Sequence, residues 1–134
     1  LPMFTLGHDF KPANIHAGGL RYHGAGMIIS QLVKDGYMHG VDVAQTEAFE
    51  AGMLFARVEG IIPAPESCHA IAATIREAKK ATEEGKNTVI LFCLSGHGLI
   101  DMPSYESYLN GDLHDYRVSD EEINKFLQTV PQVD

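Results

Sequence analysis

The sequence predicts an α/β fold: a parallel-type sheet of about three strands with helices on both faces, which makes three layers. The first observation is segment 89–94, Val-Ile-Leu-Phe-Cys-Leu, whose apolar residues run without alternation, as they do in strands covered on both faces. The second is that strand-like segments alternate along the chain with helical patterns. The third is the Ser-Gly-His-Gly turn after residue 94, because open α/β sheets bind ligands at the carboxyl ends of their strands.

Each regular element is predicted from its own local pattern. Strands are predicted at residues 3–6, 41–44 and 89–94, and helices at 27–34, 46–60, 66–84, 103–109 and 120–130. The first three helices are ended by Gly36, Gly60 and Gly85. Ser119 and Glu122 form a capping-box pattern before the last helix. The glycine-rich stretch 15–26 is predicted to hold no helix.

The chain is expected to be a single domain, residues 1–134, within a longer protein. Its length of 134 residues suits one domain. It begins at Leu1 without an initiator methionine, and a sheet of three strands leaves edges that neither charge nor proline protects. We therefore expect the remaining strands to come from the rest of that longer protein.

Composition and charge exclude several classes of partner. The formal net charge is −8, and the lysines and arginines are scattered, whereas nucleic acid and anionic membranes are bound by clustered basic residues. No signal peptide and no apolar run of membrane-spanning length are present, so a cytoplasmic location is predicted. Cys68 and Cys93 are predicted to be reduced, buried thiols and not a disulfide.

Several chemistries can be weighed from the residues themselves. Ser95, His97 and Asp101 could form a hydrolase triad, but Leu-Ser-Gly-His-Gly is not the Gly-x-Ser-x-Gly elbow. Glu66 and His69 have the i,i+3 spacing of a di-iron ligand pair, which needs a second copy that the chain lacks. Without further information, residues 95–98 can equally be an ordinary turn, and Glu66 can be an acid that favours a helix N-terminus.

Two stretches carry a family resemblance. Glu-Gly-Ile-Ile-Pro-Ala-Pro-Glu-Ser-Cys-His-Ala at 59–70 and Val-Ile-Leu-Phe-Cys-Leu-Ser-Gly-His-Gly at 89–98 closely resemble the carboxyl-terminal part of the tryptophan synthase β chain. Segments 5–10, 15–24 and 45–47 resemble the second, divergent subgroup of that family. The resemblance covers residues 1 to 115.

The resemblance implies part of a domain of a fold-type II pyridoxal-phosphate (PLP) enzyme, which joins indole and L-serine into L-tryptophan by β-replacement. The serine that matches Ser95 hydrogen-bonds the pyridine nitrogen of PLP, Gly96 lies beside it, and the glutamate that matches Glu66 lies near the ring. Part of a monovalent-cation site is matched by the backbone carbonyls of Leu20, Tyr22 and Gly24.

The same resemblance limits what this chain can do alone. The family's Schiff-base lysine, the acid beside it and its glycine-rich phosphate loop belong to the amino-terminal part, so no catalytic residue is assigned here and the isolated chain is predicted to be inactive. The complete enzyme is expected to be a homodimer, whereas binding of an α subunit stays open.

Two alternatives to this function remain. Arg21 and His97 stand where the main subgroup has an aspartate and an arginine, so the acceptor of the reaction is open. The enzyme could be a PLP-dependent β-replacement enzyme or serine deaminase for which indole is not the acceptor. Alternatively, the chain could be a stand-alone binding or interaction domain that retains the fold without catalysis.

Overall fold

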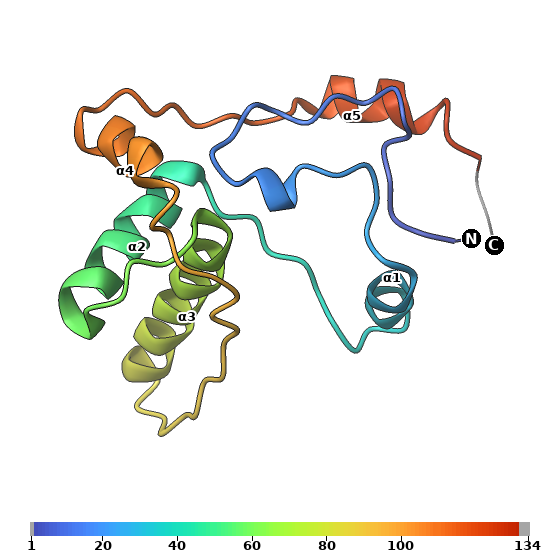
Figure 1. Cartoon of the computed structure of the whole chain (residues 1–134). Helices are drawn as coiled ribbons and strands as arrows, with labels where there is room; N and C mark the ends of the chain where they lie inside the picture. Colours follow the sequence, from blue (N-terminus) through green and yellow to red (C-terminus); the bar gives the residue numbers. More distant parts are fainter. Residues whose placement is uncertain (1, 132–134) are drawn as a thin grey trace. The chain divides into compact units, whose positions relative to one another are not determined.

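The structure, a computed structural model, describes residues 2–131 and divides into two compact units. Of the described residues, unit 1 contains 2–14, 19–41 and 116–131, and unit 2 contains 15–18 and 42–115. The regular elements are a 3₁₀ helix, η1 (Gly18–Leu20), and the helices α1 (Met27–Lys34), α2 (Gln45–Glu59), α3 (Pro65–Glu83), α4 (Met102–Leu109) and α5 (Asp120–Leu127) (Figure 1).

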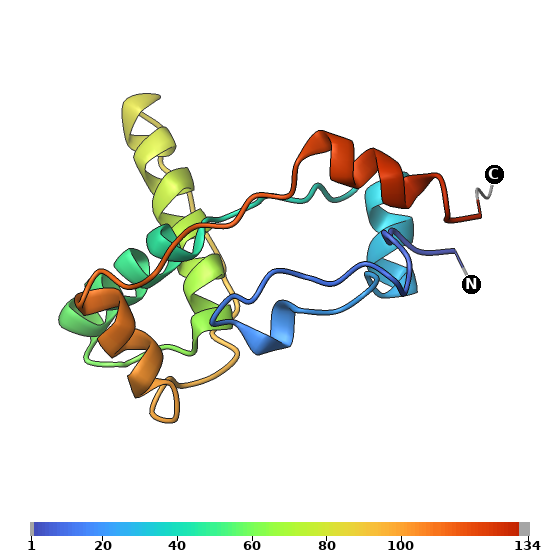
Figure 2. The same ribbon diagram turned by 90° about the horizontal axis from the view of Figure 1, so that it is seen from above.

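Unit 2 is built on the packing of α2 against α3, with α4 against α2, as the two ribbon views show (Figure 2). Phe49 of α2 lies at the centre of its core, 5.0 Å from the Tyr105 ring and 5.8 Å from the Tyr108 ring between centroids. A second apolar cluster contains Ile71 of α3, with Phe55 and Phe92 packed against it. Aromatic pairs of this kind dominate the burial in a small core.

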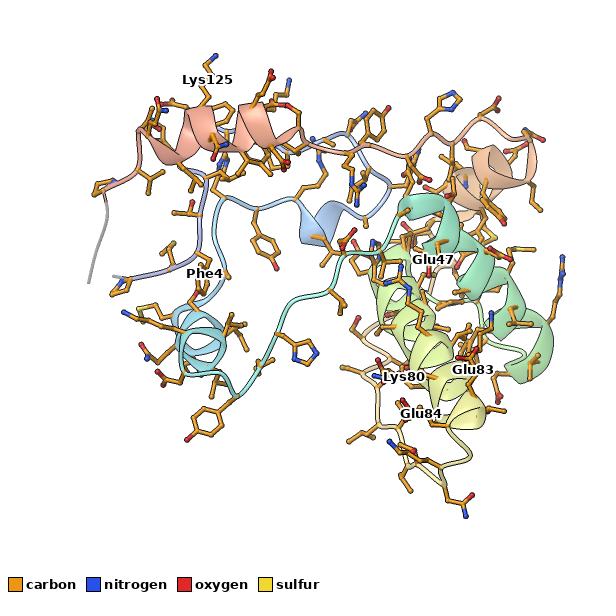
Figure 3. The ribbon with its side chains drawn as sticks, turned by 180° about the vertical axis from the view of Figure 1, so that it is seen from behind. Phe4, Glu47, Lys80, Glu83, Glu84 and Lys125 are labelled. Carbon is orange, nitrogen blue, oxygen red and sulfur yellow. The ribbon has the colours of Figure 1, made fainter. Side chains whose placement is uncertain are left out.

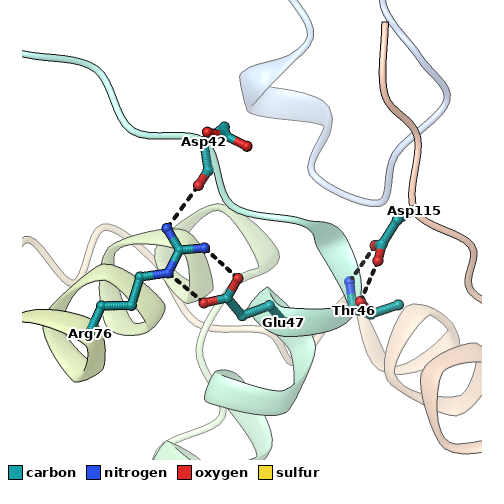
Figure 4. Close-up of polar contacts among 5 residues, drawn as sticks. All are labelled: Asp42, Thr46, Glu47, Arg76 and Asp115. Carbon is teal, nitrogen blue, oxygen red and sulfur yellow. Dashed lines mark hydrogen bonds and ion pairs between the residues drawn. The ribbon is translucent and has the colours of Figure 1, made fainter. Parts of the chain in front are cut away.

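The polar face of α3 agrees with its amphipathic pattern. Lys80, Glu83 and Glu84, which are labelled in Figure 3, are exposed at its carboxyl end. Arg76 ties the two helices together: its Nε donates to Glu47 Oε1 at 2.7 Å, and its guanidinium also donates to the Asp42 carbonyl at 3.0 Å (Figure 4). These contacts are exposed, so they orient the helices more than they stabilise them.

Unit 1 is held together by a short bridge and by α1 and α5. Thr5 and Gly24 form a single antiparallel bridge, and the Ala25 N–H donates to the Phe4 carbonyl at 3.1 Å. The Phe10 ring meets the Phe126 ring of α5 edge to face, with centroids 5.3 Å apart. Apolar contacts from sequence-distant segments therefore close this unit.

The predicted helices are confirmed within one to three residues at their ends. The α1 prediction matches, and Gly60 and Gly85 adopt positive φ angles of 71° and 63° at the ends of α2 and α3, where a side chain would be strained. Ser119 caps α5 by accepting the Glu122 N–H at 3.2 Å, as predicted. The stretch 15–26 was predicted to hold no helix, yet it contains the single turn η1.

The predicted sheet is absent from the described residues. Segments 3–6, 41–44 and 89–94 form no strand, and only isolated bridges occur between residues 2 and 131. A strand exists only where a neighbour accepts and donates its backbone hydrogen bonds, and no described segment pairs with 89–94. Val89 and Leu91 are consequently 98% and 96% exposed, although their pattern is that of a buried strand.

No helix within residues 2–131 combines the length and the apolar character that a membrane crossing requires.

Candidate functional site

The turn after segment 89–94 lies against the connector that leads into α3. Pro63 and His97 form an antiparallel bridge. Two backbone hydrogen bonds flank it. The Gly98 N–H donates to the Ile62 carbonyl at 2.8 Å, and the Ala64 N–H donates to the Gly96 carbonyl at 2.9 Å. We call this pair of segments, residues 62–64 and 96–98, the clamp. The clamp brings residue 95 to the first turn of α3.

The sequence of each segment suits this close approach. Pro63 and Pro65 favour an extended backbone before each proline, and Pro65 then opens α3 at a position where no N–H is required. Gly98 is buried, and a Cβ there would lie 2.4 Å from the Pro63 carbonyl oxygen. Only glycine therefore allows the two segments to come this close.

Tyr105 of α4 anchors the clamp from the core. Its hydroxyl donates to the Pro63 carbonyl at 2.7 Å and lies 3.3 Å from Cys68 Sγ. Burial raises the pKa of the Tyr105 phenol and that of the Cys68 thiol, so both groups stay protonated in the neutral range. Tyr105 and Cys68 therefore have a structural role: they fill the interior beneath the clamp, and Cys68 is fully buried.

The Ser67 hydroxyl joins α3 to the turn at Ser95. Ser67 Oγ accepts the N–H of Ser95 at 3.1 Å and that of Gly96 at 3.2 Å, and it lies 2.9 Å from Ser95 Oγ. Ser67 is only 1% exposed, whereas Ser95 is exposed. The buried Ser67 hydroxyl is therefore hydrogen-bonded to the exposed hydroxyl of Ser95.

Negative charge gathers beside this pair of serines. Glu66 is the second residue of α3 and immediately precedes Ser67. Burial raises the pKa of the Asp101 carboxyl, the negative charge of Glu66 raises it further, and His97 partly offsets the rise. The Asp101 carboxyl is therefore influenced by one carboxylate and one imidazole at the edge of the clamp.

The structure brings two of the predicted cofactor residues to the first turn of α3, where the third, Glu66, also lies. Ser95 and Gly96 each donate a backbone N–H to Ser67, the residue after Glu66. Leu20, Tyr22 and Gly24 lie in unit 1, where Leu20 ends η1 and Gly24 occupies the bridge to Thr5.

The rival chemistries gain no geometric support. The His97 Nδ1 accepts the Leu99 N–H at 3.3 Å and makes no hydrogen bond with Ser95, so residues 95, 97 and 101 do not form a triad. His69 Nδ1 lies 2.8 Å from the Pro65 carbonyl of its own helix and donates to it. Across the part of the chain that the structure describes, no three His, Cys, Asp or Glu residues are placed to hold a metal ion.

The sequence did not identify two residues of the site, Ser67 and Tyr105. A serine in the first turn of a helix ordinarily serves the helix itself, and a tyrosine in an amphipathic helix ordinarily fills the core. The only local signal is that Ser67 lies next to Glu66 in the stretch that carries the family resemblance. Their partners lie 28 and 42 residues away, so only the tertiary structure reveals them.

Comparisons with known proteins give a consistent result. No family model matches the chain. The chain is 63% identical over 105 residues to tryptophan synthase beta chain 2 of Thermotoga maritima, covering 78% of this chain and 25% of that protein. It is 54% identical over 131 residues to tryptophan synthase beta chain 2 of Pyrococcus furiosus, covering 98% of this chain and 29% of that protein.

A third relative, tryptophan synthase beta chain 2 of Aquifex aeolicus, is 56% identical over 115 residues, which cover 86% of this chain and 26% of that protein. The chain thus spans between a quarter and 29% of the length of these curated relatives. Over most of its own length, this chain therefore belongs with the tryptophan synthase β chains.

Proposed function

We propose that this chain forms the carboxyl-terminal part of a PLP-dependent enzyme that joins L-serine and indole into L-tryptophan by β-replacement. The observation that carries the proposal is the identity of 54–63% with proteins named tryptophan synthase beta chain, which extends over most of this chain. The geometry around Ser95 supports the proposal. Its exposed hydroxyl is held by Ser67, so it can form a hydrogen bond with one atom of a bound cofactor.

Ser95 and the clamp residue Gly96 fit PLP in their chemistry. PLP, when bound, supplies an electron sink that lets the β-substituent of the serine substrate leave. Ser95 would hold the pyridine nitrogen through a neutral hydroxyl, and Gly96 presents no side chain toward the space beside it. Ser95 carries no charge, so it does not force a proton onto that nitrogen as an aspartate would.

Glu66 supplies the charged group of the proposed site. As the second residue of α3 it lies at the helix end that favours a carboxylate. Its charge already raises the pKa of the Asp101 carboxyl. A carboxylate in this position would accept and return protons during the reaction.

The proposal also covers the rest of the assembly. Segment 89–94 would enter a parallel sheet whose other strands belong to the longer protein, with helices on both faces. The complete enzyme would be a cytoplasmic homodimer, and the carbonyls of Leu20, Tyr22 and Gly24 would contribute to a monovalent-cation site. Residues 1–134 would act as one domain there, and alone they would lack the Schiff-base lysine and be inactive.

The test is tryptophan formation from L-serine and indole by the complete polypeptide with PLP. We expect Ser95→Ala to lower kcat/KM by about 10-fold, the equivalent of one neutral hydrogen bond of about 1.4 kcal/mol. Ser107→Ala is the matched control, because it removes a hydroxyl that bonds only to the Pro103 carbonyl of its own helix.

Three outcomes of this assay would count against parts of the proposal. Unchanged kinetics for Ser95→Ala would remove the assigned role of that residue. Consumption of L-serine without tryptophan would indicate a different acceptor or a serine deaminase. Absence of PLP binding would favour a binding domain that retains the fold without catalysis.

A further inference from the structure

The hydrogen bonds of Ser67 determine which way the Ser95 hydroxyl can point. Ser67 Oγ accepts two backbone N–H groups, those of Ser95 at 3.1 Å and Gly96 at 3.2 Å. A serine oxygen has two lone pairs and one proton. Both lone pairs are therefore occupied by the turn, and Ser67 takes part in any further hydrogen bond only as the donor.

Two oxygens lie within reach of the Ser67 proton. Ser95 Oγ is 2.9 Å away, and the Gly96 carbonyl oxygen is 3.5 Å away. The shorter distance is near the usual value for a hydroxyl pair, whereas the longer one is at the limit of a hydrogen bond. The Gly96 carbonyl also already accepts the Ala64 N–H at 2.9 Å. The Ser67 proton therefore goes to Ser95.

This assignment fixes the role of Ser95. Ser95 accepts from Ser67 and cannot donate back to it, so its own proton points to an acceptor elsewhere. Within residues 2–131 the Ser95 hydroxyl makes no other hydrogen bond, and Ser95 is exposed. A hydroxyl that accepts one hydrogen bond also becomes a better donor, because the two bonds polarise each other.

We propose that Ser67 is a positioning residue that holds Ser95 as a hydrogen-bond donor toward an unprotonated ring nitrogen of the bound cofactor. The inference rests on the proposed function for the identity of that ring. A protonated ring nitrogen would need Ser95 as its acceptor, and the Ser95 proton would then lose the ring nitrogen as its partner. Ser67 thus disfavours ring protonation without touching the cofactor.

The support beneath Ser67 makes this orientation stable. Ser67 is 1% exposed and lies in the first turn of α3, two residues after Pro65. The clamp fixes the backbone of residues 96–98 against 62–64, and Tyr105 holds Pro63 from below. Ser67 therefore cannot turn away without breaking the hydrogen bonds that it accepts from the backbone N–H groups of Ser95 and Gly96.

The test uses the complete polypeptide loaded with PLP that carries ¹⁵N at the ring nitrogen. The nitrogen chemical shift is followed by NMR across the neutral pH range, and the dissociation constant of PLP is measured by fluorescence. In the unsubstituted protein, the shift should stay at the unprotonated value. In Ser67→Ala it should move toward the protonated value, and PLP should bind about 3- to 10-fold more weakly.

Two further variants separate positioning from support. Ser67→Thr keeps the hydroxyl and should restore the unprotonated shift. Tyr105→Phe removes the hydroxyl that holds Pro63 from below but leaves the hydrogen bonds of Ser67 in place. It should lower thermal stability without moving the nitrogen shift.

Each contrary result has a distinct meaning. If the unsubstituted protein binds PLP but Ser67→Ala leaves the nitrogen shift unchanged, the role of Ser67 is overturned and the proposed function stands. An equal change of the shift in Tyr105→Phe would also overturn it, since Ser67 would then act only as part of the support. If the unsubstituted protein binds no PLP, the proposed function fails and the inference fails with it.

Discussion

At the scale of single residues, the site depends on one close approach between two backbones. Gly98 is buried against the Pro63 carbonyl and the Tyr105 ring, whereas a Cβ at Gly96, two residues earlier, would make only an ordinary contact with the Ala64 side chain. The two glycines belong to the same Ser-Gly-His-Gly turn, so the sequence makes them look equivalent. Their different surroundings give a direct test of the clamp.

Replacing Gly98 by alanine should weaken the fold. The new Cβ would lie 2.4 Å from the Pro63 carbonyl oxygen and 3.1 Å from Tyr105 Cε2, and a backbone oxygen cannot move aside cheaply. We expect the free energy of unfolding to fall by about 1–3 kcal/mol, measured by denaturant titration. Gly96→Ala is the control, because its Cβ would lie in ordinary contact, 3.4 Å from the Ala64 Cβ. Equal losses in both variants would contradict the clamp.

Single residues also show which parts of the candidate site can be predicted from the sequence and which cannot. Ser95 and Glu66 were identified because each lies in a motif that resembles a known family. Ser67 was not, because its hydroxyl acts on a turn 28 residues away and no local pattern records that contact. The family resemblance therefore points to Ser95 and Glu66, whereas the contact that Ser67 makes is seen only in the tertiary structure.

At the scale of secondary-structure elements, the start of α2 depends on a distant carboxylate. Its N-cap residue, Ala44, offers no side-chain acceptor. Asp115 accepts the Thr46 N–H at 3.0 Å and the Thr46 hydroxyl proton at 2.7 Å, as Figure 4 shows. A carboxylate is favoured at the amino end of a helix, so Asp115 supplies the cap that the sequence around residue 44 lacks.

This contact makes the stability of the protein depend on pH in the acid range. The Thr46 N–H, followed by the Thr46 hydroxyl, lowers the pKa of the Asp115 carboxyl in the folded protein. The stabilisation is therefore complete above the unfolded pKa of about 3.9 and is lost as the pH falls through the lower, folded value.

We expect the Asp115→Asn variant to lose less stability than the unsubstituted protein between about pH 4 and pH 2, in urea titrations at each pH. Asp112→Asn, at an exposed position three residues earlier, should leave the acid dependence as it was. A steep acid dependence that survives in Asp115→Asn would show that other groups are responsible.

The helices were the part of the fold that the sequence predicted well. The amphipathic spacing of α3 and the cap at Ser119 act within a few residues of each other, so they can be read locally. The start of α2 was less well predicted. The sequence predicts a helix over 46–60, but α2 begins at Gln45, and Asp115, a residue far away in sequence, accepts the Thr46 N–H in its first turn.

At the scale of the whole molecule, the exposed apolar residues of segment 89–94 are the main feature to explain. Val89 and Leu91 are almost fully exposed, while Phe92 packs on Phe55, with ring centroids 5.9 Å apart. One side of the segment is therefore bound to the core, and the other is bare. The proposed sheet of the longer protein would cover it.

Leu91→Ala tests whether the longer protein covers this segment, because its effect on stability can be compared between the chain of 134 residues and the complete polypeptide. In the chain of 134 residues, the side chain is 96% exposed, so the free energy of unfolding should change by less than about 0.5 kcal/mol. In the complete polypeptide, a buried leucine at this position should cost about 2–5 kcal/mol when it is truncated. Both values are obtained from denaturant titrations.

Phe92→Ala serves as the control for Leu91→Ala. Phe92 contacts the core within this chain, so its truncation should destabilise the protein in both settings. An exposed Leu91 in the complete polypeptide, with no loss on truncation, would contradict the proposed sheet.

The sequence by itself predicted the family and the helices, because these are carried by local spacing and by motifs of contiguous residues, and it suggested Ser95, Gly96 and Glu66 as the residues proposed to meet the cofactor. Only the tertiary structure decided that Ser67 holds Ser95, that Tyr105 anchors Pro63, and that segment 89–94 has no strand partner among the described residues. Each of these depends on a contact, made or missing, between segments far apart in sequence. The apolar pattern of residues 89–94 predicts a strand that is covered on both faces, but a hydrogen-bonded sheet forms only where neighbouring strands are present.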